Sequence, residues 1–70
     1  MRLQLRIAVF FALNPETELT QVEMLHKFGL RSSNAKDTLM PCVEQGVLSI
    51  ETITRGRHIY RIGKQLKDEL

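Results

Sequence analysis

The sequence predicts a single α+β domain over residues 1–70: three helices, a two-stranded β-hairpin and a short C-terminal helix. Apolar residues recur at helical spacing in three segments between Arg2 and Gly46. Two runs rich in β-branched residues then flank a turn that contains Gly56, which is a hairpin signal. Seventy residues are enough for one small core and too few for two.

The first helix is expected from Arg2 to Leu13, and it is apolar on two faces. Leu3, Ile7, Phe10 and Phe11 share one face. The opposite face carries Leu5, Ala8, Val9 and Ala12. Pro15 cannot continue the helix and disfavours helical geometry at the residue before it. A helix with two apolar faces has to be covered on both of them.

The second helix lies in "LTQVEMLHKFGL". Thr20 and Glu23 have the spacing of a capping box, in which each side chain bonds the other residue's backbone amide. Met24, Leu25 and Phe28 follow at helical spacing, and Gly29 is a natural left-handed stop.

The third helix lies in "RSSNAKDTLMPCVEQGVL", where Ser32 or Ser33 can cap the start and Gly46 ends it. Its apolar stripe is Ala35, Leu39, Cys42 and Val43. Pro41 has no backbone N–H to donate a hydrogen bond to the Asp37 carbonyl, so we expect a kink near Asp37 or a helix in two pieces.

Two strands are expected in "VLSIETITRGRHIYRIG". One parity of the first carries Leu48, Ile50 and Thr52, and one parity of the second carries His58, Tyr60 and Ile62. Ile53 and Ile59 point to the other side, where they are candidates to pair across the hairpin. The closing "GKQLKDEL" is a short charged helix with Leu66 and Leu70 on one face.

Both ends of the chain resemble targeting signals. The last four residues, "KDEL", match a signal for retention in the endoplasmic reticulum, and two arginines precede an apolar run near the start. The residues after Phe11, however, do not fit a signal-peptide cleavage site. The single cysteine, Cys42, excludes an internal disulfide, and no apolar run has transmembrane length. We therefore interpret both ends as structural and expect a cytoplasmic protein.

Nothing in the sequence indicates an enzyme. It holds no paired carboxylates, glycine-rich phosphate loop or catalytic triad, and no catalytic residue is expected. His26 and His58 lie far from any ligand pattern, and Cys42 is expected in the core. Accordingly, no metal, cofactor or small-molecule ligand is predicted.

One set of motifs spans residues 19 to 62. It consists of Leu19-Thr20, Phe28-Gly29-Leu30, Ala35 and Leu39-x-x-Cys42-x-x-x-Gly46-Val47-Leu48, followed by "RGRH" and "YRI". Together these motifs resemble the winged helix-turn-helix family of DNA-binding regulators, with "RGRH" and "YRI" in the wing. It implies a small regulator of transcription, of bacterial or phage type, whose partner is double-stranded DNA. Pro41 inside the recognition helix and Asp37, where the family often has a basic residue, depart from the pattern.

In this family the third helix enters the major groove and the wing touches the DNA backbone or the minor groove. The DNA-binding residues expected here are Arg31, Ser32, Ser33, Asn34, Lys36, Asp37 and Met40, with Arg55, Arg57 and His58 at the wing tip. Asn34 could read adenine, and Asp37 could accept from cytosine. Between Met24 and Lys64, seven Lys and Arg residues stand against three acidic residues, a net charge of +4.

Plainer interpretations remain open. "SSNAK" serves equally well as a capped helix start, and charged residues usually form a solvated face. Asp37, Pro41 and the modest overall charge of +2 favour an alternative function, a protein–protein interaction module on the same fold.

The second apolar face of the first helix, formed by Leu5, Ala8, Val9 and Ala12, has no obvious partner within the chain. We expect it to form a homodimer interface, because two-fold dimers are the commonest oligomers. The alternative is a monomer in which the C-terminal helix folds back over this face.

Overall fold

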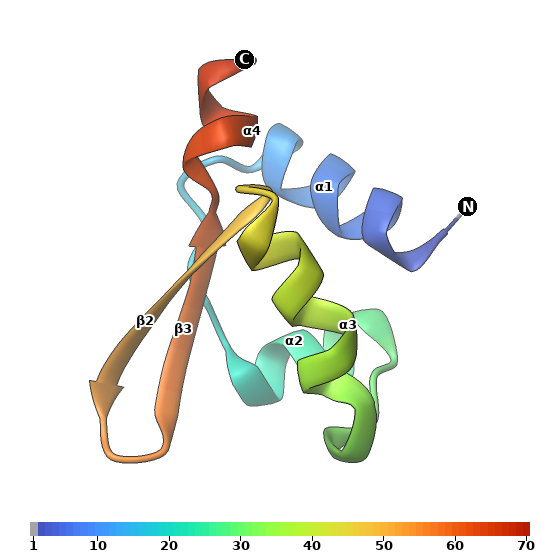
Figure 1. Ribbon diagram of the computed structural model, residues 1–70, viewed down its shortest axis with the longest axis vertical. Helices are drawn as coiled ribbons and strands as arrows, with labels where there is room; N and C mark the ends of the chain where they lie inside the picture. The colour runs from blue at the N-terminus through green and yellow to red at the C-terminus, as the bar shows by residue number, and fades with distance from the viewer. Residues whose placement is uncertain (1) are drawn as a thin grey trace.

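The computed structural model describes residues 2–70 and confirms an α+β fold (Figure 1). The elements in chain order are α1 (Leu3–Leu13), β1 (Leu19–Thr20), α2 (Gln21–Phe28), α3 (Ser32–Glu44), β2 (Leu48–Thr54), β3 (Arg57–Ile62) and α4 (Lys64–Asp68). The three strands form one antiparallel sheet in the order β1-β3-β2. The long β2–β3 hairpin reaches away from the helices, and its turn lies at the opposite end of the molecule from α4 (Figure 1).

The predicted two-stranded hairpin is present as β2 and β3, but the sheet contains a third strand, β1, that the sequence did not predict. Leu19 and Thr20 pair with Tyr60 and Ile59 of β3, so a short strand stands between α1 and α2. Thr20 caps α2 with an extended backbone, at φ −71° and ψ 166°, and a cap residue in this conformation can also pair as a strand. The two-residue run was too short to show a strand period in the sequence.

The hairpin register confirms the predicted faces. Leu48 pairs with Ile62, Ile50 with Tyr60 and Thr52 with His58. The predicted pairing of Ile53 with Ile59 is wrong, because Ile59 stands opposite Glu51 and the register shifts between Thr52 and Thr54. This irregularity leaves Ile53 out of the regular pairing, as a β-bulge does.

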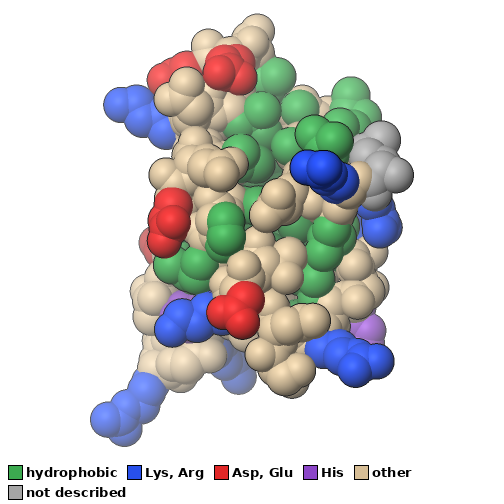
Figure 2. All heavy atoms as spheres, turned by 45° about the vertical axis from the view of Figure 1, so that its right-hand side comes forward, with side chains coloured by type: hydrophobic (Ala, Val, Ile, Leu, Met, Phe, Trp, Pro, Cys, Tyr) green, Lys and Arg blue, Asp and Glu red, His purple; other side chains and the backbone are tan. Residues whose placement is uncertain are grey.

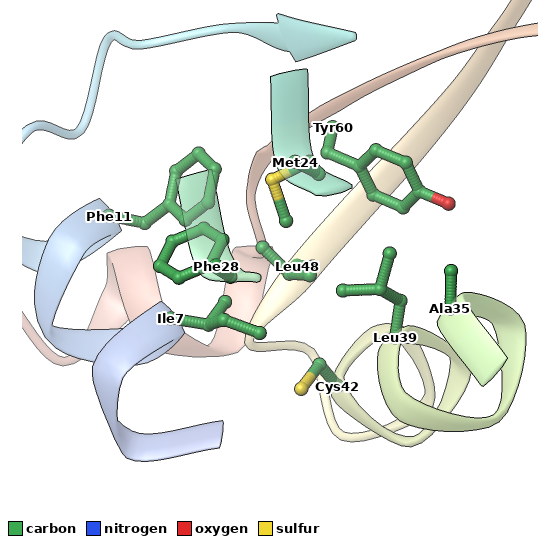
Figure 3. Packing of buried hydrophobic residues seen from close by; sticks show 9 residues of the cluster. All are labelled: Ile7, Phe11, Met24, Phe28, Ala35, Leu39, Cys42, Leu48 and Tyr60. Carbon is green, nitrogen blue, oxygen red and sulfur yellow. The ribbon is translucent and has the colours of Figure 1, made fainter. Parts of the chain in front are cut away.

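One apolar core joins all the main elements (Figure 3). Ile7 and Phe11 from α1 meet Met24 and Phe28 from α2, and Phe10 packs edge-to-face on Phe28 at 5.9 Å between ring centroids. The complete buried set is Ile7, Phe11, Met24, Phe28, Ala35, Leu39, Cys42, Leu48 and Tyr60. The core faces predicted for the three main helices are therefore confirmed, and Cys42 lies in the core as expected.

The ends of α2 are as predicted. Thr20 Oγ1 accepts from the Glu23 amide at 3.2 Å, and Glu23 Oε1 accepts from the Thr20 amide at 3.0 Å. These bonds lower the pKa of the Glu23 carboxyl, because they favour its charged form. Gly29 ends the helix in the left-handed conformation, at φ 66°.

The start of α3 differs from the prediction. The cap residue is Arg31, and neither Ser32 nor Ser33 caps the helix. Asn34 Oδ1 instead accepts from the Arg31 amide at 3.2 Å. The helix then runs unbroken through Pro41, so the expected division into two pieces is wrong. The backbone amides of Gly46 and Val47 bond the carbonyls of Val43 and Cys42, and this closes the helix where a Gly stop was predicted.

The last helix, α4, is fastened to the turn between α3 and β2. The Gly63 amide donates to the Val47 carbonyl at 2.8 Å, and the Leu66 amide donates to the Gly46 carbonyl at 3.2 Å. Leu66 packs on the edge of the core, whereas Leu70 is 66% exposed. Leu5 and Val9 of α1 remain exposed while Ala8 and Ala12 are half-buried, so the second apolar face is covered only in part.

Candidate nucleic-acid interface

The structure brings the two predicted DNA-contacting segments to one end of the molecule. The start of α3 and the turn of the β2–β3 hairpin both lie at the lower end in Figure 1, on either side of α2. An open groove of about 650 Å³ runs between them and is lined by Ser32 on one side and by Arg57 and His58 on the other. Figure 2 shows Lys and Arg side chains protruding at this end.

The exposed side of α3 carries most of the predicted contacts. Ala35 and Leu39 face the core, which turns Lys36 and Asp37 to the solvent. Met40 is half-buried, so it lies at the edge of this surface. The exposed residues at the start of the helix are Arg31, Ser32, Ser33, Asn34, Lys36 and Asp37.

Asn34 has a structural role at this end of α3. Its Oδ1 is held against the Arg31 amide, which satisfies one of the free donors at the helix start. Within residues 2–70 its side-chain nitrogen donates no hydrogen bond, and an amide can still donate to a base acceptor. The sequence suggested adenine reading for this residue, and the structure adds the cap.

The positive charge is distributed unequally along the hairpin. Arg61 bridges Glu18, at 2.7 Å from Nε to Oε1, and also contacts Glu51. The hydrogen bond to Glu18, and then that to Glu51, raise the pKa of the Arg61 guanidinium. These carboxylates neutralise Arg61, so it adds little to a nucleic-acid surface. Within residues 2–70, no ion pair involves Arg31, Lys36, Arg55 or Arg57.

His58, one of the predicted contacts, and Lys27 are both fixed by neighbours. His58 is half-buried, and its Nδ1 lies 3.1 Å from Thr52 Oγ1 on the paired strand. Lys27 Nζ sits over the Phe10 ring, 4.3 Å from the centroid, and so shields an aromatic side chain at the edge of the core. His58 therefore contributes to the wall of the groove, while Lys27 supports the packing of α1 on α2.

The floor of the groove is apolar, a feature that sequence reasoning missed. It contains Leu25, Ile53, Ile59 and Val22, and the last of these is 62% exposed. The sequence offered one signal for this apolar groove: Val22 and Ile53 are apolar residues that lie outside the core-facing positions of their own elements. Only the packing of α2 beside the hairpin shows that they meet.

The face predicted for self-association lies on α1, away from this end (Figure 1). Leu5 and Val9 are exposed, whereas Ala8 and Ala12 are half-buried. Leu13, which the sequence analysis did not include, is 76% exposed. Figure 2 shows apolar side chains gathered over this part of the molecule.

Two further observations concern other kinds of site. Across residues 2–70, no helix combines the length and the apolar character that crossing a membrane requires. The same residues place no three His, Cys, Asp or Glu side chains together as metal ligands.

Comparison of the chain with protein-family models, with curated proteins and with solved structures finds no match.

Proposed function

We propose that this protein is a winged helix-turn-helix regulator that binds double-stranded DNA, with α3 in the major groove and the β2–β3 turn on the backbone or the minor groove. The observation that carries the proposal is a set of four basic residues that make no ion pair within residues 2–70 and belong to two segments at one end of the molecule (Figure 1). Arg31 and Lys36 stand at the start of α3, and Arg55 and Arg57 stand at the hairpin turn. Phosphate contacts by such residues supply most non-specific affinity.

The connection between α2 and α3 supports the same proposal. Three residues, Gly29 to Arg31, join the two helices, and Gly29 has a positive φ of 66°. A short turn of this length, often with a glycine, is typical of helix-turn-helix units, whose second helix reads the major groove. In this role Asn34, Lys36 and Asp37 face base edges, and the arginines position the protein on phosphates.

Two substitutions separate these roles. Arg57→Ala should weaken binding to all duplexes alike, because a phosphate contact carries no sequence information. Asn34→Ala should weaken binding only to a preferred site, by about 1–3 kcal/mol. Lys67→Ala removes one positive charge from α4 and serves as the control, with no expected effect.

The measurement is an amide NMR titration with a duplex at low salt, repeated at higher salt. Shifts confined to residues 31–40 and 55–58 that fade with salt would support the interface. Thermal unfolding of Asn34→Ala should be recorded in parallel, because the residue also caps α3. If Arg57→Ala and Asn34→Ala both leave duplex binding unchanged, the proposed docking is wrong.

The apolar floor of the groove favours a second candidate function, the binding of a protein partner. DNA backbone contacts call for polar and basic groups, whereas Val22, Ile53 and Ile59 offer apolar area between the hairpin and α2. Ile53 is 56% exposed, so Ile53→Ser should leave the fold intact. Loss of a protein partner with retention of duplex binding in this variant would favour the second function.

A further inference from the structure

The outer side of α1 carries an apolar ridge that the described chain does not cover. Leu5, Val9 and Leu13 are 54%, 44% and 76% exposed. They follow one another at intervals of four residues, which places them on a single ridge of the helix. Scattered apolar residues are normal on a surface, whereas apolar residues that adjoin one another on a single ridge offer a candidate contact surface.

We propose that this ridge is a two-fold interface with a second copy of the chain, in which the two α1 helices pack antiparallel with Val9 on the axis. Ridges formed by residues four apart pack together at a crossing angle of about 50°. In this arrangement Leu5 lies opposite Leu13 of the second copy, and Val9 meets Val9. A two-fold interface is self-complementary, so every such contact occurs twice.

The shape of the surface fits this arrangement. A hollow of about 270 Å³ lies beside Leu5, between α1 and the end of α3. Its lining is apolar at Leu5, Ala8, Cys42 and Val47 and polar at Arg2, Gln4 and Gln45. At the other end of the ridge, Leu13 protrudes into the solvent. Antiparallel pairing brings each protruding Leu13 to the hollow of the opposite copy, and both hollows are then occupied.

Charge decides the direction of pairing. Arg2 lies just before α1 and Glu16 lies just after it, each seven positions from Val9 and each exposed. Neither forms an ion pair within residues 2–70. Antiparallel pairing brings Arg2 towards Glu16 of the second copy and also opposes the two helix dipoles. Parallel pairing would bring Arg2 towards Arg2, and like charges disfavour it.

The position of α1 makes the inference independent of the proposed function. The ridge lies away from the hairpin turn and the start of α3, so the dimer leaves the basic end free (Figure 1). The tests below contain no DNA, and their failure would leave the DNA proposal standing.

The first test is disulfide cross-linking of Val9→Cys in a Cys42→Ala background. A residue on a two-fold axis meets its own copy, so mild oxidation should link most of the protein into dimers on a non-reducing gel. Val22→Cys on α2 is the matched control, because Val22 is similarly exposed at 62% and lies off the interface. Mixing Leu5→Cys protein with Leu13→Cys protein should give more dimer than either alone. Equal cross-linking of Val9→Cys and Val22→Cys would overturn the proposal.

The second test is sedimentation of the unmodified chain at high micromolar concentration. The expected mass is about twice the 8.1 kDa of one chain. Leu13→Glu should shift the mass to one chain by weakening the dimer about tenfold or more, since a charge would enter an apolar contact. Val22→Glu should not. A single-chain mass for the unmodified protein, or an unchanged dimer in Leu13→Glu, would show that the ridge is not the interface.

Discussion

Gly63 lies where the end of β3 passes against the turn between α3 and β2. A Cβ at this position would come 2.0 Å from the Gly46 carbonyl oxygen and 2.6 Å from the Val47 carbonyl carbon. Both are backbone atoms, so they cannot move aside as a flexible side chain could. At the scale of the residue, the close approach of two backbones requires glycine here.

Gly63→Ala should therefore lower the free energy of unfolding by about 3 kcal/mol or more. The measurement is urea unfolding followed by circular dichroism. Gly56→Ala is the matched control, because Gly56 has a positive φ of 77° but open space around it. It should cost only about 1 kcal/mol, from backbone strain alone. Equal losses in the two variants would contradict the steric explanation.

Two buried groups predict the response to alkaline pH. Burial raises the pKa of the Cys42 thiol and of the Tyr60 phenol. Each group therefore binds its proton more tightly in the folded state than in the unfolded state. The stability that this provides is fully present below the unfolded pKa values, about 8.5 for Cys and about 10 for Tyr, and it is lost as pH rises through the higher folded values.

The free energy of unfolding should accordingly fall as pH rises above about 8.5. Urea unfolding across this pH range checks the direction. Cys42→Ala should remove the part of this decrease in the free energy of unfolding that begins at the lower pH, and leave the part at higher pH that is due to Tyr60. If the alkaline profile of Cys42→Ala matches that of the unmodified chain, Cys42 makes no such contribution.

At the scale of the element, the second and third helices begin in different ways. Thr20 and Glu23 form a reciprocal cap at the start of α2. Ser33 is the second residue of α3, two positions after the cap residue Arg31, and it makes no side-chain hydrogen bond within residues 2–70. A hydroxyl side chain therefore caps α2, whereas the Ser33 hydroxyl of α3 makes no hydrogen bond within residues 2–70.

Thr20→Ala should lower the free energy of unfolding by about 1 kcal/mol, because it removes the acceptor for the Glu23 amide. Ser33→Ala should change it by less than about 0.5 kcal/mol, since no bond is lost. Thermal unfolding of both variants provides the comparison. A larger loss in Ser33→Ala than in Thr20→Ala would mean that the caps are assigned to the wrong residues.

At the scale of the whole molecule, the proposed function predicts how duplex binding should depend on salt. The four basic side chains that make no ion pair within residues 2–70 at the proposed interface are Arg31, Lys36, Arg55 and Arg57. A duplex binder that neutralises four phosphates should show a log–log slope of affinity against salt of about −3.6. Arg57→Ala should reduce the magnitude of this slope by about 1. Arg61→Ala should leave the slope nearly unchanged, because Glu18 and Glu51 already neutralise Arg61.

Fluorescence titration of a labelled duplex over a series of salt concentrations gives these slopes. A slope near zero would favour the protein-binding alternative. A large change in Arg61→Ala would instead show that its ion pairs open on DNA binding.

The amino-acid sequence by itself determined the helices and their apolar faces. Thr20 with Glu23, Gly29 and Gly46 act on the backbone within a few residues, so their effects can be inferred without a fold. The alternation of residues along β2 and β3 likewise predicted which side chains share a face. The positions of the exposed residues at the start of α3 followed from the same local periodicity.

The tertiary structure alone decided the features that depend on distant partners. Leu19 and Thr20 become a strand because β3 offers them an edge, and Arg61 is neutralised by Glu18, 43 positions away in the chain. The apolar groove exists because α2 packs beside the hairpin, and Leu13 remains exposed although α4 packs against α1. Local pattern fixes which way a side chain faces along its own element. Only packing between elements fixes what that side chain meets.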